Sequence, residues 1–342
     1  MIDWVTVVIP FTHSPIDSGS VIKILPGGEV DWRSPCRQSV PGSFDKNVSV
    51  RSMGGDGHGV ATSLWIDGNP SKFLQGHNIF GSDDLLSLVY DMLIKVCRSL
   101  GIMPKLSELR MVKEGGYEIS RVDINYSYEL PNRKDVLAWL RAAEYKSKTR
   151  HGRSAMSGGT LYWGKKSTWW TLKAYSKGEE IAAGKKHKLP DELLATPLTD
   201  WADNKLRVEL TLRGKEFIRL GVEKAKDLTM DRIKSLYSLY VRRIEMTDQI
   251  ALSCEKQMEL PRRLRSTYIL WKNGEDLRSV LPRNTFYRHR RELLENGIDI
   301  TLSQESIDVS NVVPLIRILE AKPVSIPDWA FDRGLIHSSA RA

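Results

Sequence analysis

The sequence predicts an α+β protein, with an antiparallel central sheet flanked by helices and then a mainly helical, basic C-terminal region. Two observations support this fold class. Segments with the alternation of β-strands are interspersed with amphipathic helical segments as far as about residue 220. Beyond Phe217 the pattern is helical, and residues 260–294 are strongly basic. We expect a sheet domain over residues 1–220, a helical region over residues 221–335, and a disordered tail over residues 336–342.

Composition narrows the class of partner. The 342 residues carry a net charge of +9, which indicates a polyanionic partner, with nucleic acid as the first candidate. Three cysteines, at positions 36, 97 and 254, stand far apart without CxxC spacing. This pattern argues against a disulfide framework and against a thiolate zinc site.

The first residues, MIDWVTVVIPF, place an acid at position 3 and lack a basic leader, and no run approaches about 18 apolar residues. We therefore expect a protein that is not exported and does not enter a membrane.

The N-terminal part reads as short strands separated by loops. Trp4–Ile9 is an apolar strand that we expect to stop at Pro10, and the residues up to Gly59 have the composition of loops and hairpins. Val60–Asp67 predicts another strand, followed by a turn at residues 68–70.

His77, in the segment LQGHNIFG, is the first candidate functional residue. On a strand edge it would be a metal ligand or a proton carrier. The alternative is a hydrogen-bonded structural histidine, which is the commoner case.

The next segments alternate between helix and strand. Asp83–Leu100 has helical spacing with acids at its start, and Arg133–Glu144 is a second amphipathic helix. Between them Tyr117–Leu130 alternates as a strand and puts Arg121 and Asp123 on its polar face. Such a pair is usually a salt bridge, but in a sheet that also carries His77 the Asp123 carboxylate is a natural ligand for a divalent metal.

The aromatic segment SGGTLYWGKKSTWWTLKAYSKGEE predicts a hairpin in residues 157–180, with strands at Leu161–Trp163 and Thr168–Ala174. We expect Tyr175 and Lys177 to share a face, because they are two residues apart. An ammonium group beside a phenol would stabilise the phenolate that an attacking tyrosine needs. A hairpin that only packs is the alternative. Three tryptophans, at positions 163, 169 and 170, are candidates for stacking on unpaired bases unless the core buries them.

Basic residues gather beside this hairpin. Tyr145–Arg153 is almost devoid of apolar residues, and both this stretch and the hairpin turn offer cations to phosphates, unless they are merely solvated. The candidate DNA contacts here are Lys146, Lys148, Arg150, Arg153, Lys165 and Lys166.

Glu209 is an acid in the middle of a predicted strand, Lys205–Leu212, on the same face as Arg207. It is either the partner of a neighbouring cation or a third metal ligand.

The segment LPRNTFYRHRRELLENG begins with capping residues and ends on Gly297, which predicts a helix. A basic helix of this kind is a candidate for facing duplex DNA, although a solvated face is nearly as common. The residues concerned are Arg283, Arg288, Arg290 and Arg291.

Several of these blocks recur, in order, in one known family. LQGHNIFG, SRVDINYSYELPN, TLKAYSK, LRVEL, LPRNTFYR and NVVPLIRI, between the opening MID and the closing PDWA, resemble the gene II type replication initiator of filamentous bacteriophages. The resemblance runs from Met1 to about Ala330. It implies a site-specific, strand-nicking endonuclease and strand-transferase that starts and ends rolling-circle replication, on an HUH-type fold.

The resemblance also implies the site. The family's nucleophile falls on Tyr175, with Lys177 beside it; because GTLYWGKKS resembles a block of rolling-circle plasmid initiators, Tyr162 is the alternative nucleophile. Resemblance and strand geometry together suggest metal ligation by His77, Asp123 and Glu209. The sequence departs from the HUH pattern in offering a single histidine, so a carboxylate-rich site for Mg²⁺ or Mn²⁺ is expected.

The implied partners are phage origin DNA, as duplex and single strand, and a helicase and polymerase of the host, in the host bacterial cytoplasm. Oligomerisation on the origin stays open. Two other functions fit the residues by themselves. A non-enzymatic DNA-binding replication regulator would not need the candidate site residues to converge, and a metal-dependent nuclease that uses water would never form a covalent adduct with DNA.

Overall fold

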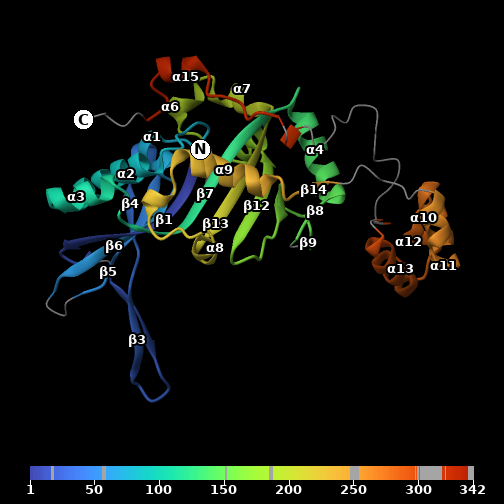
Figure 1. Ribbon diagram of the computed structural model, residues 1–342, viewed down its shortest axis with the longest axis horizontal. Coiled ribbons are helices and arrows are strands. Elements are labelled where there is room, and N and C mark those ends of the chain that lie inside the picture. The colour runs from blue at the N-terminus through green and yellow to red at the C-terminus, as the bar shows by residue number, and fades with distance from the viewer. Residues whose placement is uncertain are drawn as a thin grey trace.

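A nine-stranded antiparallel sheet forms the centre of the computed structural model (Figure 1). The structure describes residues 1–16, 19–55, 59–150, 152–184, 188–246, 254–296, 298, 300, 318–319 and 321–337. The strand order is β10-β11-β12-β13-β7-β1-β6-β5-β4. Their bounds are β1 Ile2–His13, β4 Gln38–Pro41, β5 Asn47–Met53, β6 Ala61–Gly68, β7 Glu118–Glu129, β10 Ala155–Ser157, β11 Thr160–Trp163, β12 Trp170–Ser176 and β13 Lys205–Arg213.

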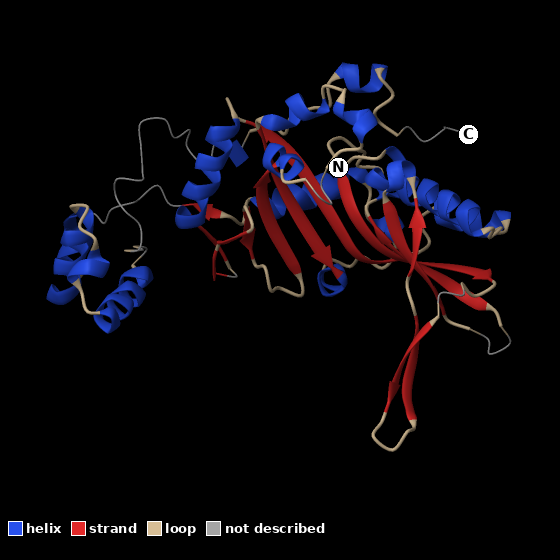
Figure 2. Ribbon diagram, turned by 180° about the vertical axis from the view of Figure 1, so that it is seen from behind, coloured by secondary structure: helices blue, strands red, loops and turns tan. Residues whose placement is uncertain are grey.

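One face of the sheet is apolar and is covered by helices. Alternate residues of the strands share a single core with α2 (Leu85–Leu100), α4 (Arg133–Lys146) and α9 (Met230–Val241), of which α9 crosses the sheet in Figure 1. The opposite face is polar. In the view from behind in Figure 2 no helix crosses the middle of the central strands, but the polar side chains of β13 on this face are themselves buried. The predicted α+β class, an antiparallel sheet with flanking helices and a helical C-terminal region, is confirmed.

Shorter elements surround the sheet. A hairpin of β2 (Ser20–Ile24) and β3 (Val30–Pro35) projects from it (Figure 2), and β14 (Glu245–Met246), β8 (Ser147–Thr149) and β9 (Gly152–Arg153) form a small second sheet. The further helices are α1 Pro70–Gln75, α3 Leu106–Lys113, α5 Lys177–Ala182, α6 Asp191–Leu194, α7 Leu198–Asp203, α8 Gly214–Arg219 and α15 Asp328–Asp332, with 3₁₀ turns at Ser43–Asp45 and Ala225–Asp227.

Strand β1 is longer than predicted. Pro10 does not end it: Pro10 is paired with Ser63, and the strand continues to His13 after a shift in register. A proline lacks the amide hydrogen that a ladder uses, and such a residue is tolerated where the pairing is irregular.

The predicted turn at residues 68–70 is instead the start of α1. The Asn69 side chain accepts a hydrogen bond from the Lys72 amide, and Pro70 occupies the first turn, so these residues form a helix N-terminus. Gly76 ends α1 with φ of 86°. His77 therefore lies in a loop, and the expected position on a strand edge is wrong.

The C-terminal helices are α10 (Cys254–Glu259), α11 (Arg262–Lys272), α12 (Leu277–Val280) and α13 (Arg283–Glu295). The last three enclose a core of their own, whereas α9 packs on the sheet. None of the described helices is long and apolar enough to cross a membrane.

The segment 321–337 returns to the sheet, where the Val324 amide donates to the Ser127 carbonyl at 2.8 Å. Two residues of the tail that we expected to be disordered are packed: Ile336 lies on a cluster that includes Leu335, and His337 bonds Asp91. Residues 338–342 lie outside the described residues.

Candidate functional site

The polar face brings side chains from five adjacent strands into register. Lys173 of β12 is paired with Glu209 of β13, and Glu209 with Asn125 of β7. One step along, Thr211 is paired with Asp123, which is also paired with Trp4 of β1. On the other side of β12, Tyr162 of β11 is paired with Lys173, so the Tyr162 side chain lies on the same polar face.

Tyr175 is buried, with 7% of the residue exposed, and its hydroxyl donates a long hydrogen bond of 3.4 Å to Glu209 Oε2. Burial raises the pKa of the phenol well above its usual value, and the carboxylates of Glu180 and Glu209 raise it further. The phenol is thus protonated in this arrangement. A nearby carboxylate oxygen is the acceptor to which it can transfer its proton.

Lys173 supplies the positive charge next to this pair. Its Nζ lies 2.7 Å from Glu209 Oε1 and 5.8 Å from the centroid of the Tyr175 ring. Burial by itself would lower the pKa of Lys173, but the carboxylates of Glu209, Asp123 and Asp3 raise it, so the ammonium group is charged. Burial raises the pKa of Glu209, against the effect of Lys173.

Lys177 occupies a different position from the one expected. Ser176 caps α5, so Lys177 begins a helix and does not continue β12. Its Nζ donates to Asn78 Oδ1 at 2.9 Å and pairs with Glu180, while Asn78 Nδ2 donates to Asp3 Oδ1 at 2.7 Å. Burial lowers the pKa of Lys177 to about 8.

Arg207 fixes the loop that carries His77. The guanidinium group is fully buried and donates to the carbonyl oxygens of Asn78 and Ile79 at 2.5 and 2.7 Å, and to Ser127 Oγ at 3.2 Å. A cation in mid-strand thus anchors a loop 128 residues away in the chain.

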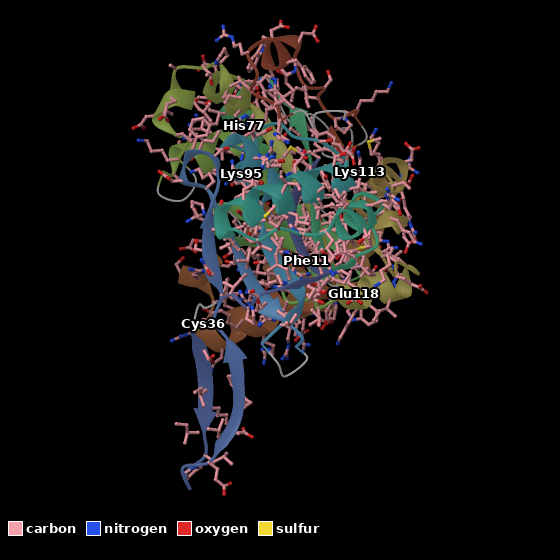
Figure 3. The ribbon with its side chains drawn as sticks, turned by 90° about the vertical axis from the view of Figure 1, so that its left-hand side faces the viewer. Phe11, Cys36, His77, Lys95, Lys113 and Glu118 are labelled. Atoms are coloured by element: carbon pink, nitrogen blue, oxygen red, sulfur yellow. The ribbon has the colours of Figure 1, made fainter. Side chains whose placement is uncertain are left out.

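His77 is buried. Figure 3 shows it in the part of the molecule far from the β2–β3 hairpin, next to which Cys36 is labelled. Its Nδ1 accepts from the Ile79 amide at 3.2 Å, so its Nε2 carries the hydrogen and donates to the Leu335 carbonyl at 2.8 Å. Burial lowers the pKa of the imidazole to about 4. Because of these two hydrogen bonds, neither ring nitrogen of His77 is free to bind a metal ion.

The predicted metal ligands are only partly brought together. Asp123 and Glu209 lie on neighbouring strands of one face, both almost fully buried, and Asp123 forms a bidentate pair with Arg121 at 2.8 and 2.6 Å. Within the part of the chain that the structure describes, no group of three His, Cys, Asp or Glu side chains is placed to hold a metal ion.

Asn125 allows a test of whether the face fits a divalent metal. It is fully buried beside Glu209, and both polar atoms of its side chain lack a hydrogen-bond partner among the described residues. An orphaned amide oxygen next to two carboxylates is a donor set that suits Mg²⁺ or Mn²⁺. The carboxylate part of the predicted site fits such an ion, and His77, as it is bonded here, does not.

Tyr162 is half-buried, and the Lys165 ammonium group lies 4.9 Å from the centroid of its ring. It thus has a cation of its own, on the same face of the sheet as Tyr175.

The basic residues beside the hairpin lie mostly at the surface. Lys148 pairs with Glu245, Arg150 lies over the Trp170 ring, and Lys165 donates to Ser157 Oγ. Lys166 is exposed in the β11–β12 turn and Lys146 half-buried at the end of α4, while the side chain of Arg153 lies outside the described residues.

Of the three tryptophans, Trp163 and Trp170 are fully buried and cannot stack on bases, whereas Trp169 is 39% exposed. On α13, Arg283, Arg288 and Arg291 are exposed and Arg290 is half-buried.

Four residues that build this site were not predicted from the sequence. Lys173 could have been found, because Lys173 and Tyr175 are two apart on one strand. Asp3, an acid in an apolar strand, was a usable signal as well. The anchoring role of Arg207 and the orphaned amide of Asn125 depend on contacts between distant segments, which no local pattern reveals.

Comparison with known proteins identifies the family. The family model for the N-terminal part of the phage replication-associated protein, the gene 2 protein, matches residues 1–231, and the model for the C-terminal part of the same protein matches residues 252–336. The chain is similar to the replication-associated protein of Enterobacteria phage I2-2, with 48% identity over 342 residues, 100% of this chain and 99% of that protein.

The chain is also similar to the proteins of that name in Enterobacteria phages M13 and f1, each 25% identical over 319 residues, 77% of this chain and 76% of the relative. The ordered sequence blocks predicted this relationship, and the two family models together cover most of the chain. The chain belongs to the family of the replication-associated gene 2 proteins of filamentous phages.

Proposed function

We propose that the protein is a site-specific DNA endonuclease and strand-transferase that initiates and terminates rolling-circle replication of a filamentous phage genome. The observation that carries the proposal is the buried cluster of Tyr175, Glu209 and Lys173, a nucleophile with a proton acceptor and a cation around it. Membership of a family of replication-associated proteins supports the choice of DNA as substrate.

In the proposed reaction the Tyr175 oxygen attacks the scissile phosphorus and its proton passes to Glu209. The bond from phosphorus to the 3′ oxygen breaks, and this oxygen takes a proton from solvent water to become a free 3′-hydroxyl, while Glu209 returns its proton to solvent. The product is a 5′-phosphotyrosine, and because a phosphodiester replaces a phosphodiester, a 3′-hydroxyl can later attack it and reseal the strand. Lys173 would stabilise negative charge on the phosphoryl oxygens.

We propose Mg²⁺ or Mn²⁺ as the cofactor, held by Asp123 and Glu209 with the orphaned oxygen of Asn125 as an additional ligand. A divalent ion there would polarise the non-bridging phosphate oxygens. Asp123 is now paired with Arg121, and Glu209 with Lys173. To bind the ion, each carboxylate would have to break its ion pair with that cation.

The proposed partners are the phage origin, as duplex and as single strand, and a helicase and a polymerase of the host, with the host cytoplasm as location. The exposed cations Lys165 and Lys166, in the β11–β12 turn, and Arg150, between β8 and β9, would contact DNA phosphates near the nick.

The test is an assay for the covalent intermediate. The protein is incubated with supercoiled DNA that carries the phage origin and with Mg²⁺, and denaturing gels are probed for protein-linked DNA. We expect the adduct with the wild-type protein and its loss in Tyr175→Phe, with Tyr162→Phe as the matched control.

Loss of the adduct only in Tyr162→Phe would move the nucleophile to β11, whose tyrosine shares the same face. Nicking without an adduct in any variant would instead identify a nuclease that uses water, and binding without nicking would identify a replication regulator.

A further inference from the structure

The C-terminal helices form a compact unit that the nicking chemistry does not use. Helices α11, α12 and α13 share a core to which each contributes. It is built from Leu264, Tyr268, Trp271, Leu277, Phe286 and Leu293.

Helices α12 and α13 are joined by a turn of Leu281 and Pro282 alone. Pro282 caps α13 with φ of −54°, and its carbonyl accepts from the Phe286 amide at 2.9 Å. A short helix, a tight turn and a longer basic helix, supported by a third helix, resemble the arrangement of helix-turn-helix DNA-binding units, although their turn usually has about three to four residues.

Helix α13 has two distinct faces. Phe286, His289 and Leu293 point into the core, and His289 Nδ1 is hydrogen-bonded to Thr267 Oγ1 at 2.8 Å. The other face presents a continuous exposed stripe at helical spacing, made of Asn284, Tyr287, Arg288 and Arg291.

The charge of this stripe is positive over the first half of the helix. Arg283 is exposed next to it, and the first acid along α13, Glu292, pairs with Arg263 of α11 at 2.8 Å. The surface therefore complements a polyanion.

The stripe also contains residues that phosphate binding does not need. Tyr287 is 52% exposed, and its ring lies edge-on to that of Phe286 with the centroids 5.4 Å apart. Asn284 lies one turn before Arg288. Asparagine pairs with adenine and arginine with guanine through two hydrogen bonds in the major groove, and an aromatic edge contacts the thymine methyl group.

We infer that α12 and α13 form a helix-turn-helix unit and that α13 lies in the major groove of duplex DNA. Asn284 and Arg288 contact base edges, and Arg283 and Arg291 contact phosphates. The inference rests on the proposed function only in taking DNA as the partner, and it assigns the recognition of a base sequence to a surface outside the nicking site.

The experiment uses the full-length protein in EDTA, so that binding is measured without cleavage. Duplexes are selected from a random library, and affinities for the selected duplex and for a scrambled one are then measured by fluorescence anisotropy. We expect Asn284→Ala and Arg288→Ala to weaken binding to the selected duplex by about 5- to 150-fold each, with a far smaller effect on the scrambled duplex.

The two arginines assigned to phosphates have a different signature. Arg291→Ala should weaken binding to both duplexes alike and should reduce the slope of log affinity against log salt by about 1. Arg262→Ala, at an exposed arginine of α11, is the matched control and should leave the ratio of the two affinities unchanged.

Equal losses on both duplexes in Asn284→Ala and Arg288→Ala would overturn base recognition by α13, and so would a failure to select any common sequence. Circular dichroism shows whether each variant is folded, and Asn284→Gln, which keeps an amide, provides a second variant at that position. The binding assay does not depend on nicking, so its outcome is independent of whether Tyr175→Phe abolishes nicking. Either proposal can therefore be refuted without the other.

Discussion

The Tyr175 hydroxyl lies 3.4 Å from Glu209 Oε2, on the adjacent strand of the sheet. Both side chains point to the polar face, so neither contributes to the apolar core on the other side of the sheet. The contact therefore joins the proposed nucleophile to a carboxylate that can take its proton, and it leads to the first prediction.

Glu209→Gln should slow formation of the covalent adduct by about 10²- to 10⁴-fold, because an amide cannot accept the phenol proton. Single-turnover nicking at saturating protein is the measurement, with affinity for origin DNA measured in parallel. Glu118→Gln, at a carboxylate that is exposed and pairs with Lys224, is the control and should nick at the wild-type rate. An unchanged rate in Glu209→Gln would remove Glu209 from the proton transfer.

Binding of Mn²⁺ should distinguish the candidate ligands. We expect Asp123→Asn and Asn125→Ala to weaken Mn²⁺ binding by at least about 10-fold, as the loss of a supporting or ligating group does. His77→Gln should leave it unchanged, because both ring nitrogens are already hydrogen-bonded. Isothermal titration calorimetry without DNA measures the Mn²⁺ affinity of each variant directly. A large loss in His77→Gln would mean that the C-terminal segment moves away to release the imidazole.

Stability should depend on pH through His77. The unfolded chain takes up this proton near pH 6.5, whereas burial keeps the folded imidazole neutral down to about pH 4. Between these values the unfolded state binds more protons, so the folded state loses stability as the pH falls, by about 3 kcal/mol in total.

Urea unfolding of the wild type and of His77→Gln at pH 7, 5.5 and 4.5 tests this. The difference in unfolding free energy between pH 7 and 4.5 should be smaller in the variant. Equal pH dependence in both proteins would show that His77 does not remain neutral when folded.

Replacing the two adjacent tryptophans, Trp169 and Trp170, should affect different properties of the protein: stability for Trp170 and DNA binding for Trp169. Trp170→Ala should cost about 3–5 kcal/mol of unfolding free energy, because the indole is fully buried against Tyr240. Trp169→Ala should change stability by less than about 0.5 kcal/mol. If Trp169 stacks on DNA, its removal should weaken single-strand binding by about 1–3 kcal/mol. Thermal unfolding and anisotropy on an oligonucleotide separate the two effects.

The alternation of side chains between the two faces of a strand made the central part of the site predictable. Alternation placed Asp123 and Glu209 on the polar faces of their strands, and the structure pairs those strands side by side. The same rule would have selected Lys173 as the neighbour of Tyr175. Choosing Lys177 instead extended the strand past Ser176, whose side chain caps a helix and turns the chain.

The surroundings of His77 were beyond local patterns. Its loop position follows from the short helix α1, whose start at Asn69 and Pro70 and whose end at Gly76 could have been recognised. Its hydrogen bond to Leu335 spans 258 residues and depends on where the C-terminal segment packs. Burial of Trp163 and Trp170 likewise depends on helices that cover only one face of the sheet.

The Asn78 amide has a consequence for when the site can form during synthesis. Its oxygen binds Lys177, 99 residues later in the chain, and its nitrogen binds Asp3, 75 residues earlier. One planar group therefore joins the first strand, the His77 loop and the start of α5. During synthesis this junction cannot close before residue 177 has left the ribosome, and β13, which carries Glu209, follows later still. A chain that ends before β13 thus cannot assemble the cluster of Tyr175, Lys173 and Glu209.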